Sequence, residues 1–130
     1  MIKFMGGYNS HMHLKVTIDA LTQEWKMITR LVLPIKKKWF DMIRSGEKKE
    51  EYREIKPYWT KRFHTIGLVD NYGFVIPHKP TLITLQNGYG KDAPFVRVWV
   101  TLNIADGYEK WGAEPGKPYY VLEIIGGLRT

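Results

Sequence analysis

The sequence contains no cysteine. This absence excludes a disulfide scaffold, a thiolate zinc site, an iron–sulfur cluster and a cysteine nucleophile, and it suits the reducing cytosol. The chain also lacks an apolar run of about 20 residues, the length that a membrane-spanning helix needs. Its N-terminal segment, MIKFMGGYNSHMHLK, is too polar for a signal peptide. We therefore expect a cytoplasmic protein with no membrane segment.

Acidic residues are outnumbered by basic ones. The 13 aspartates and glutamates stand against 20 lysines and arginines, which gives a formal net charge of +7. Ten of the basic residues and only five acidic ones fall between Lys36 and Arg62, so the positive charge is concentrated in that stretch. A basic chain favours anionic partners, although such stretches also form ordinary solvated helix faces.

Several catalytic and metal-binding patterns are missing. The sequence has neither a glycine-rich phosphate-binding loop nor a serine nucleophile elbow. His11 and His13 are close together, but His64 and His78 are distant in sequence, so the four histidines form no convincing ligand set. We expect neither a metal nor a cofactor.

The hydrophobic pattern predicts two helices among short strands. An amphipathic helix is predicted at Ile35–Ser45, with Pro34 at its first position and Gly46 just beyond its end. A short second helix is predicted at Tyr58–Phe63, after Pro57. Strands are predicted at Thr29–Leu33, Glu50–Ile55, Thr65–Val69, Tyr72–Ile76, Thr81–Gln86, Phe95–Ile104 and Tyr119–Ile125. The longest of them, Phe95–Ile104, is apolar on both faces, which predicts a central strand.

The 130 residues and the 44% hydrophobic content are enough for one domain with a core. We expect this domain at 27–130, preceded by an extension, 1–26, whose order the pattern leaves open. One early helix followed by short strands predicts an α+β fold. Its expected architecture is a small, mostly antiparallel β-barrel with one main amphipathic helix and a short second helix beside the barrel mouth.

Three charged residues near the predicted barrel mouth are the main candidates for chemistry. Glu51 and Arg53 are two residues apart on a predicted strand, so their side chains share one face, and Tyr52 lies on the other. Lys48 lies in the preceding turn, from which its flexible stem would reach over the same opening. Together these groups would bind a phosphate or a base edge, or transfer protons. Alternatively, they form a partly exposed ion-pair cluster that adds little stability.

The motif that these residues form resembles that of a known family. Four fixed positions in eight residues follow a helix that a Leu-x-Leu-Pro strand precedes. They match the G-x-K-x-x-E-x-R hallmark of ASCH domains, which belong to the PUA-like β-barrel superfamily. The resemblance covers about residues 29–127 and includes the last strand around Glu123. The four motif residues are Gly46, Lys48, Glu51 and Arg53.

The resemblance implies a PUA-like barrel with a cleft beside the motif that binds RNA or a nucleotide-like small molecule. In that cleft Arg53 would grip a phosphate or a base edge, Lys48 would supply a mobile charge, and Glu51 would accept hydrogen bonds. Gly46 would provide the turn and a close backbone approach. The expected ligand-binding residues are Gly46, Lys48, Glu51, Arg53, Asn87 and Tyr89.

Other interpretations stay open. A hydrolase, either a ribonuclease on single-stranded RNA or an amidohydrolase on modified nucleosides, would use Lys48 and Glu51 as catalytic residues. The amidohydrolase branch of the family carries a threonine at the position of Glu51, so its threonine-dependent chemistry does not carry over. An adaptor would instead dock an acidic protein on Lys36–Lys38. Tyr58 and Trp59, among cations, would stack on bases or pack inward.

Overall fold

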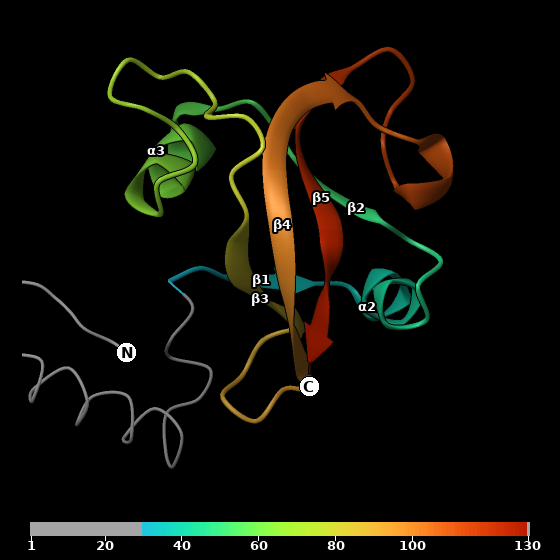
Figure 1. The fold of residues 1–130 in the computed structure, drawn as a ribbon. Coiled ribbons are helices and arrows are strands. Elements are labelled where there is room, and N and C mark those ends of the chain that lie inside the picture. Colours follow the sequence, from blue (N-terminus) through green and yellow to red (C-terminus); the bar gives the residue numbers. More distant parts are fainter. Residues whose placement is uncertain (1–29, 130) are drawn as a thin grey trace, which may run out of the picture. The chain divides into compact units, whose positions relative to one another are not determined.

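The computed structural model describes residues 30–129, nearly all of which belong to one compact unit, Leu31–Thr130. The predicted extension, 1–26, and the predicted start of the domain lie outside the described residues. The part that the structure describes has an α+β fold, as predicted (Figure 1). Its elements are β1 (Val32–Ile35), α2 (Lys37–Arg44), β2 (Glu50–Arg53), α3 (Pro57–Thr65), β3 (Thr81–Asn87), β4 (Phe95–Asp106), the 3₁₀-helix η2 (Glu109–Trp111) and β5 (Pro118–Arg129).

The strands form one curled, mixed sheet in the order β1-β3-β4-β5-β2. Three of its pairings are antiparallel, whereas β1 runs parallel to β3. The long strands β4 and β5 are strongly curved (Figure 1), so the sheet is a half-barrel. Among the described residues β1 and β2 pair only with their inner neighbours, so the sheet has two edges rather than the closed ladder of a complete barrel.

The core fills the concave side of this half-barrel. Strand β4 is the middle strand, as its apolar pattern predicted, and its alternating valines are buried. Each helix contributes buried apolar side chains to the same core, and each fully buried large side chain stabilises the fold by about 1.5–3 kcal/mol. The core includes Leu33, Phe40, Ile43, Phe63, Ile83, Leu85, Val96, Val98, Val100, Leu102 and Leu122.

The first helix begins later than predicted. Pro34 lies within β1 instead of at the start of a helix, and α2 begins at Lys37 after an extended Lys36. An edge strand tolerates proline because the missing N–H can face away from the ladder. The predicted end of the helix is confirmed, because Gly46 follows with φ of 86°.

The region after the second helix also differs from the prediction. Helix α3 begins at Pro57, as predicted, but it extends to Thr65. The two strands predicted beyond it are reduced to a single β-bridge between Val69 and Val75. The carboxylate of Asp70 accepts hydrogen bonds from the following backbone and holds the intervening residues in a tight loop, too short to form a ladder. Within residues 30–129 no helix is long and apolar enough to cross a bilayer.

Candidate functional site

The candidate site lies at the seam between the two edge strands, β1 and β2. The carbonyls of Leu31, just before β1, and of Ile35, its last residue, accept hydrogen bonds from the β3 side, from Thr84 N at 3.0 Å and Gly88 N at 2.9 Å. Because backbone groups alternate in direction along a strand, the carbonyl of Pro34 faces the seam.

The same alternation holds in β2. The carbonyl of Lys49 accepts a hydrogen bond from Ile124 N of β5 at 2.9 Å. The next carbonyls along the strand that face away from β5 are therefore those of Glu50 and Tyr52. Side chains, rather than another strand, bind these seam-facing carbonyls.

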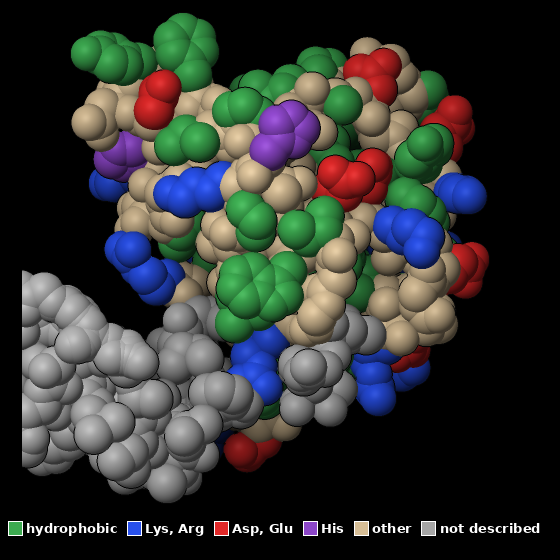
Figure 2. All heavy atoms as spheres, in the orientation of Figure 1, with side chains coloured by type: hydrophobic (Ala, Val, Ile, Leu, Met, Phe, Trp, Pro, Cys, Tyr) green, Lys and Arg blue, Asp and Glu red, His purple; other side chains and the backbone are tan. Residues whose placement is uncertain are grey.

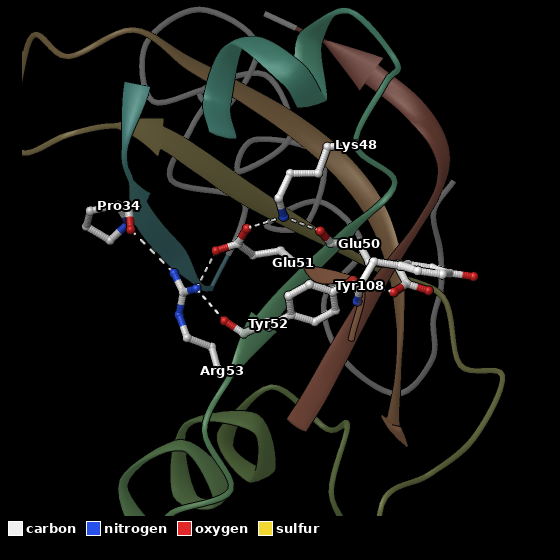
Figure 3. A network of polar contacts seen from close by, with 7 residues as sticks. All are labelled: Pro34, Lys48, Glu50, Glu51, Tyr52, Arg53 and Tyr108. Atoms are coloured by element: carbon white, nitrogen blue, oxygen red, sulfur yellow. Dashed lines mark hydrogen bonds and ion pairs between the residues drawn. The ribbon is translucent and has the colours of Figure 1, made fainter. Parts of the chain in front are cut away.

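Arg53 joins the two edges of the sheet. Its Nη2 donates to Pro34 O of β1 at 3.3 Å, and its Nη1 donates to Tyr52 O of β2 at 2.8 Å (Figure 3). Nη1 also forms an ion pair with Oε2 of Glu51. One planar guanidinium thus spans the gap that backbone pairing leaves open, a task suited to its rigid fork of donors.

Lys48 completes the network from the other side of Glu51. Its Nζ lies 2.8 Å from Oε1 of Glu51 and also donates to the carbonyl of Glu50 (Figure 3). The Glu51 carboxylate is therefore held between an ammonium and a guanidinium. Only 2% of Lys48 and 6% of Glu51 is exposed, which makes this a buried network rather than a surface ion pair.

The turn after α2 positions Lys48. The left-handed backbone of Gly46 ends the helix, and the N–H of Lys48 donates back to Met42 O at 3.0 Å. The ammonium then lies 5.6 Å from the centre of the Trp39 ring and 5.1 Å from that of Tyr52. The prediction of a mobile lysine that reaches over the opening is wrong, because these contacts enclose Lys48.

Burial lowers the pKa of Lys48 below its usual 10.5, while the charge and hydrogen bond of Glu51 act in the opposite direction. Tyr52 is affected by its surroundings as well. Burial raises the pKa of its phenol, which donates to Glu50 Oε1 at 2.7 Å and accepts from Tyr108 N at 3.0 Å. Both groups are fixed in place by hydrogen bonds at the site.

A cavity of about 900 Å³ opens beside this network. Among the six residues expected to bind ligand, the structure places Glu51, Arg53 and Tyr89 on its wall, whereas Gly46, Lys48 and Asn87 are not on it. For all six residues, contact with a ligand stays a prediction. The wall is formed by β1, β2, β5, the helical segments α2, α3 and η2, and connecting residues, through Val32, Leu33, Pro34, Ile35, Lys36, Trp39, Glu51, Tyr52, Arg53, Glu54, Tyr58, Trp59, Arg62, Gly88, Tyr89, Trp111, Gly112 and Tyr119.

Aromatic rings cover much of this wall. The guanidinium of Arg53 lies 5.2 Å from the Trp59 ring. Arg62 lies 5.6 Å from the Tyr58 ring and 5.7 Å from the Trp59 ring, and it donates to the Tyr58 hydroxyl at 2.7 Å. The inward-packing interpretation of Trp59 is correct in part, since it contacts the core as well as the cavity.

Sequence reasoning missed other parts of the wall. No cavity role was predicted for Trp39, Trp111 or Tyr119, yet all three line the cavity, and Trp39 also packs against the core. Trp111 is buried, and its indole nitrogen is the one buried side-chain polar atom without a hydrogen-bond partner in the described part of the chain. The sequence offered one signal for these aromatic residues, which is that tryptophans occur close to basic residues, as Trp39 does to Lys38 and Trp111 to Lys110.

The charges around the cavity are unevenly neutralised. Hydrogen bonds from Lys117 and Lys56 lower the pKa of Glu54 from 4.5 to about 2. Among residues 30–129, neither Lys36 nor Arg62 belongs to an ion pair. The wall therefore has two cations available to an anion. The described residues include no cluster of three or more histidine, cysteine, aspartate or glutamate side chains that suits a metal ion.

Comparisons with known proteins give no relative from which to transfer a function: no family model matches the chain, and no significant match was found among curated proteins or solved structures.

Proposed function

We propose that this chain is an ASCH-type, PUA-like domain that binds RNA or a nucleotide-like ligand in the cavity at the seam. The observation that carries the proposal is the composition of the wall, where the Glu51–Arg53 pair lies among aromatic rings in a space of about 900 Å³. This volume is near the upper end of small-molecule sites, about 300–1,000 Å³, and it accommodates a nucleotide. The curled sheet and the G-x-K-x-x-E-x-R spacing support the family assignment.

The wall suits both parts of a nucleotide. Flat aromatic side chains such as Trp39 and Trp59 offer surfaces on which a base can stack, each worth about 1–3 kcal/mol. The cations Lys36 and Arg62 would attract the phosphate. Arg53 already donates hydrogen bonds to two protein carbonyls, which fix its guanidinium in place. Its proposed role is to donate to the ligand from the edge of the guanidinium that stays available.

The contacts favour binding over hydrolysis. Both oxygens of Glu51 are engaged by cations, so this carboxylate would have to give up an ion pair before taking a proton from a substrate. Lys48, the other proposed catalytic residue, is buried behind Glu51 and is not on the cavity wall. A nucleophile or acid at that position would not reach a guest.

The proposal is tested by titrating the full chain with the four nucleoside 5′-monophosphates and with single-stranded RNA. Tryptophan fluorescence is a direct readout, because Trp39, Trp59 and Trp111 line the cavity. We expect saturable quenching, and we expect Arg62→Ala to weaken binding about tenfold, or 1.4 kcal/mol. Arg44→Ala is the matched control, since Arg44 is exposed on α2 and does not line the cavity.

Two results would count against the proposal. One is the absence of any fluorescence change with all of these ligands. The other is an equal loss of affinity in Arg62→Ala and Arg44→Ala, which would show that net charge alone accounts for the binding. Chromatography of the same mixtures checks for cleaved products, and turnover that Glu51→Gln abolishes without loss of affinity would establish the hydrolase instead.

A further inference from the structure

Helix α3 borders a second hollow, which we call the α3 groove. Its volume is about 540 Å³, and its wall combines apolar side chains with polar and charged ones. The cavity at the seam takes Tyr58, Trp59 and Arg62 from α3, whereas the groove takes a different row of the same helix. The residues that line the groove are Ile55, Lys56, Pro57, Thr60, Lys61, His64, Val69, Asp70, Asn71 and Gly73.

The far wall of the groove is a loop with a fixed shape. Oδ1 of Asp70 accepts hydrogen bonds from the backbone N–H groups of Tyr72 and Phe74, at 2.8 and 3.0 Å. The side chain of Asn71 is bonded to Nε2 of His64 on α3 at 2.9 Å, which ties the loop to the helix. Gly73, with φ of 89°, permits the turn between the two aromatic residues.

This loop displays two aromatic side chains to solvent. Tyr72 is 85% exposed and Phe74 is 70% exposed, although the backbone that carries them is held by hydrogen bonds. Figure 2 shows hydrophobic side chains protruding over this part of the molecule, with acidic, basic and histidine side chains beside them. Exposed rings on a preorganised loop are suited to binding, because little conformational entropy is lost when a partner stacks on them.

Positive charge connects the groove with the cavity. Lys61 faces the groove and Arg62, its neighbour in sequence, lines the cavity. In the described part of the chain neither is in an ion pair with a carboxylate. A path across α3 therefore offers both rings and cations, the combination that binds single-stranded nucleic acid without requiring a particular sequence. The one carboxylate among the described residues that line the groove, that of Asp70, is hydrogen-bonded to the backbone of its own loop.

We infer that the occupant is a single-stranded nucleic acid that enters the cavity at the seam, crosses α3 and stacks bases on Tyr72 and Phe74. This inference rests on the proposed function and makes the ligand a strand rather than a free nucleotide. A helix with its side chains is about 10–12 Å across, so one nucleotide cannot contact both hollows. A strand of roughly four or more nucleotides is required, as for other single-strand sites.

The test compares ligands of different length on the full chain. Fluorescence anisotropy measures binding of labelled single-stranded RNA and DNA hexamers, and competition measures binding of dinucleotides and nucleoside 5′-monophosphates. The double variant Tyr72→Ala/Phe74→Ala is compared with Ile104→Ala, and Lys61→Ala with Lys49→Ala. Both controls remove an exposed side chain that lines neither hollow.

We expect the hexamers to bind at least tenfold more tightly than the monophosphates. The double variant should weaken hexamer binding about tenfold or more, because stacking on two rings is lost. Lys61→Ala should reduce the slope of log affinity against log salt by about one. Neither change should alter monophosphate binding, and the two control variants should behave like the wild-type chain.

Hexamers that bind no more tightly than monophosphates would overturn this inference and leave the cavity proposal intact. The absence of binding by any ligand would overturn the cavity proposal itself. Self-association that the double variant abolishes, with hexamer affinity unchanged, would show that Tyr72 and Phe74 form a protein interface and would also overturn the inference.

Discussion

Replacing Lys48 by methionine tests how strongly the buried network stabilises the fold. The change removes the ammonium that contacts Oε1 of Glu51 and the carbonyl of Glu50, and it leaves both oxygens without that donor. Because Lys48 is only 2% exposed, the expected loss is that of breaking a buried ion pair, about 3–5 kcal/mol. This is a large part of a typical unfolding free energy of about 5–15 kcal/mol.

The matched control is Lys37→Met on α2. Lys37 pairs with Asp41 at 2.6 Å, a shorter distance than the 2.8 Å between Lys48 and Glu51, but the two side chains are 75% and 50% exposed. Solvent screening limits the contribution of such a pair to about 1 kcal/mol or less. The comparison therefore separates burial from ion-pair distance.

Urea unfolding of the full chain, followed by tryptophan fluorescence, measures both losses. In thermal unfolding of a domain of this size, each kcal/mol of lost stability lowers Tm by about 4–8 °C, so Lys48→Met should lower Tm by about 12 °C or more. A loss below about 1 kcal/mol, or one equal to that of Lys37→Met, would refute the reasoning.

The effect of pH on Lys48 has a definite sign. Burial lowers the pKa of this lysine in the folded chain, whereas the unfolded chain keeps the ordinary value of 10.5. Between the lowered pKa of the folded chain and 10.5, the unfolded state therefore binds more protons at Lys48 than the folded state does. The free energy of unfolding rises with pH over this interval. The Lys48→Met variant should lack this rise relative to the wild-type chain.

Two further predictions follow from the cavity wall. A Cβ at Gly112 would lie 3.0 Å from Cζ2 of Trp39, on a backbone with φ of 102°, so Gly112→Ala should lower both the stability of the fold and the ligand affinity. The control is Gly116→Ala, where φ is 73° and no atom lies near the new Cβ. This control should cost only the backbone strain, about 1–2 kcal/mol. Hydrogen bonds from Lys117 and Lys56, together with their charges, lower the pKa of Glu54 from 4.5 to about 2, so the stabilisation from Glu54 is present above pH 4.5 and disappears as pH falls toward 2. When the free energy of unfolding is measured as a function of pH, Glu54→Gln should lack this acid-induced loss, and high salt should weaken the loss in the wild-type chain.

Local patterns predicted the parts of the fold that depend on local chemistry. Gly46 ends a helix because it adopts positive φ easily, and Pro57 begins one because the first helical N–H needs no partner. The apolar residues on both faces of Phe95–Ile104 correctly predicted a central strand. Pro34 was misassigned because the start of a helix and the edge of a sheet both accept proline, and an edge is defined only by distant strands.

The candidate site divides in the same way. Glu51 and Arg53 share a face because side chains alternate along a strand, which depends on spacing alone. The burial of Lys48 depends on Trp39 and Tyr52, whose rings come from different elements and enclose the ammonium only after the chain folds. The contribution of Trp39, Trp111 and Tyr119 to the aromatic wall was missed for the same reason, since these residues come from different elements that only the folded chain brings together.

The bond from Arg53 to Pro34 has a consequence for motion at the seam. In a closed barrel, separating two neighbouring strands breaks a whole row of backbone bonds. Here the backbone of β1 is linked to β2 by a guanidinium, so a widening of the seam would leave every ladder in the sheet paired. We therefore expect the seam to open at a lower free energy than global unfolding, which would let a guest enter while the sheet stays folded.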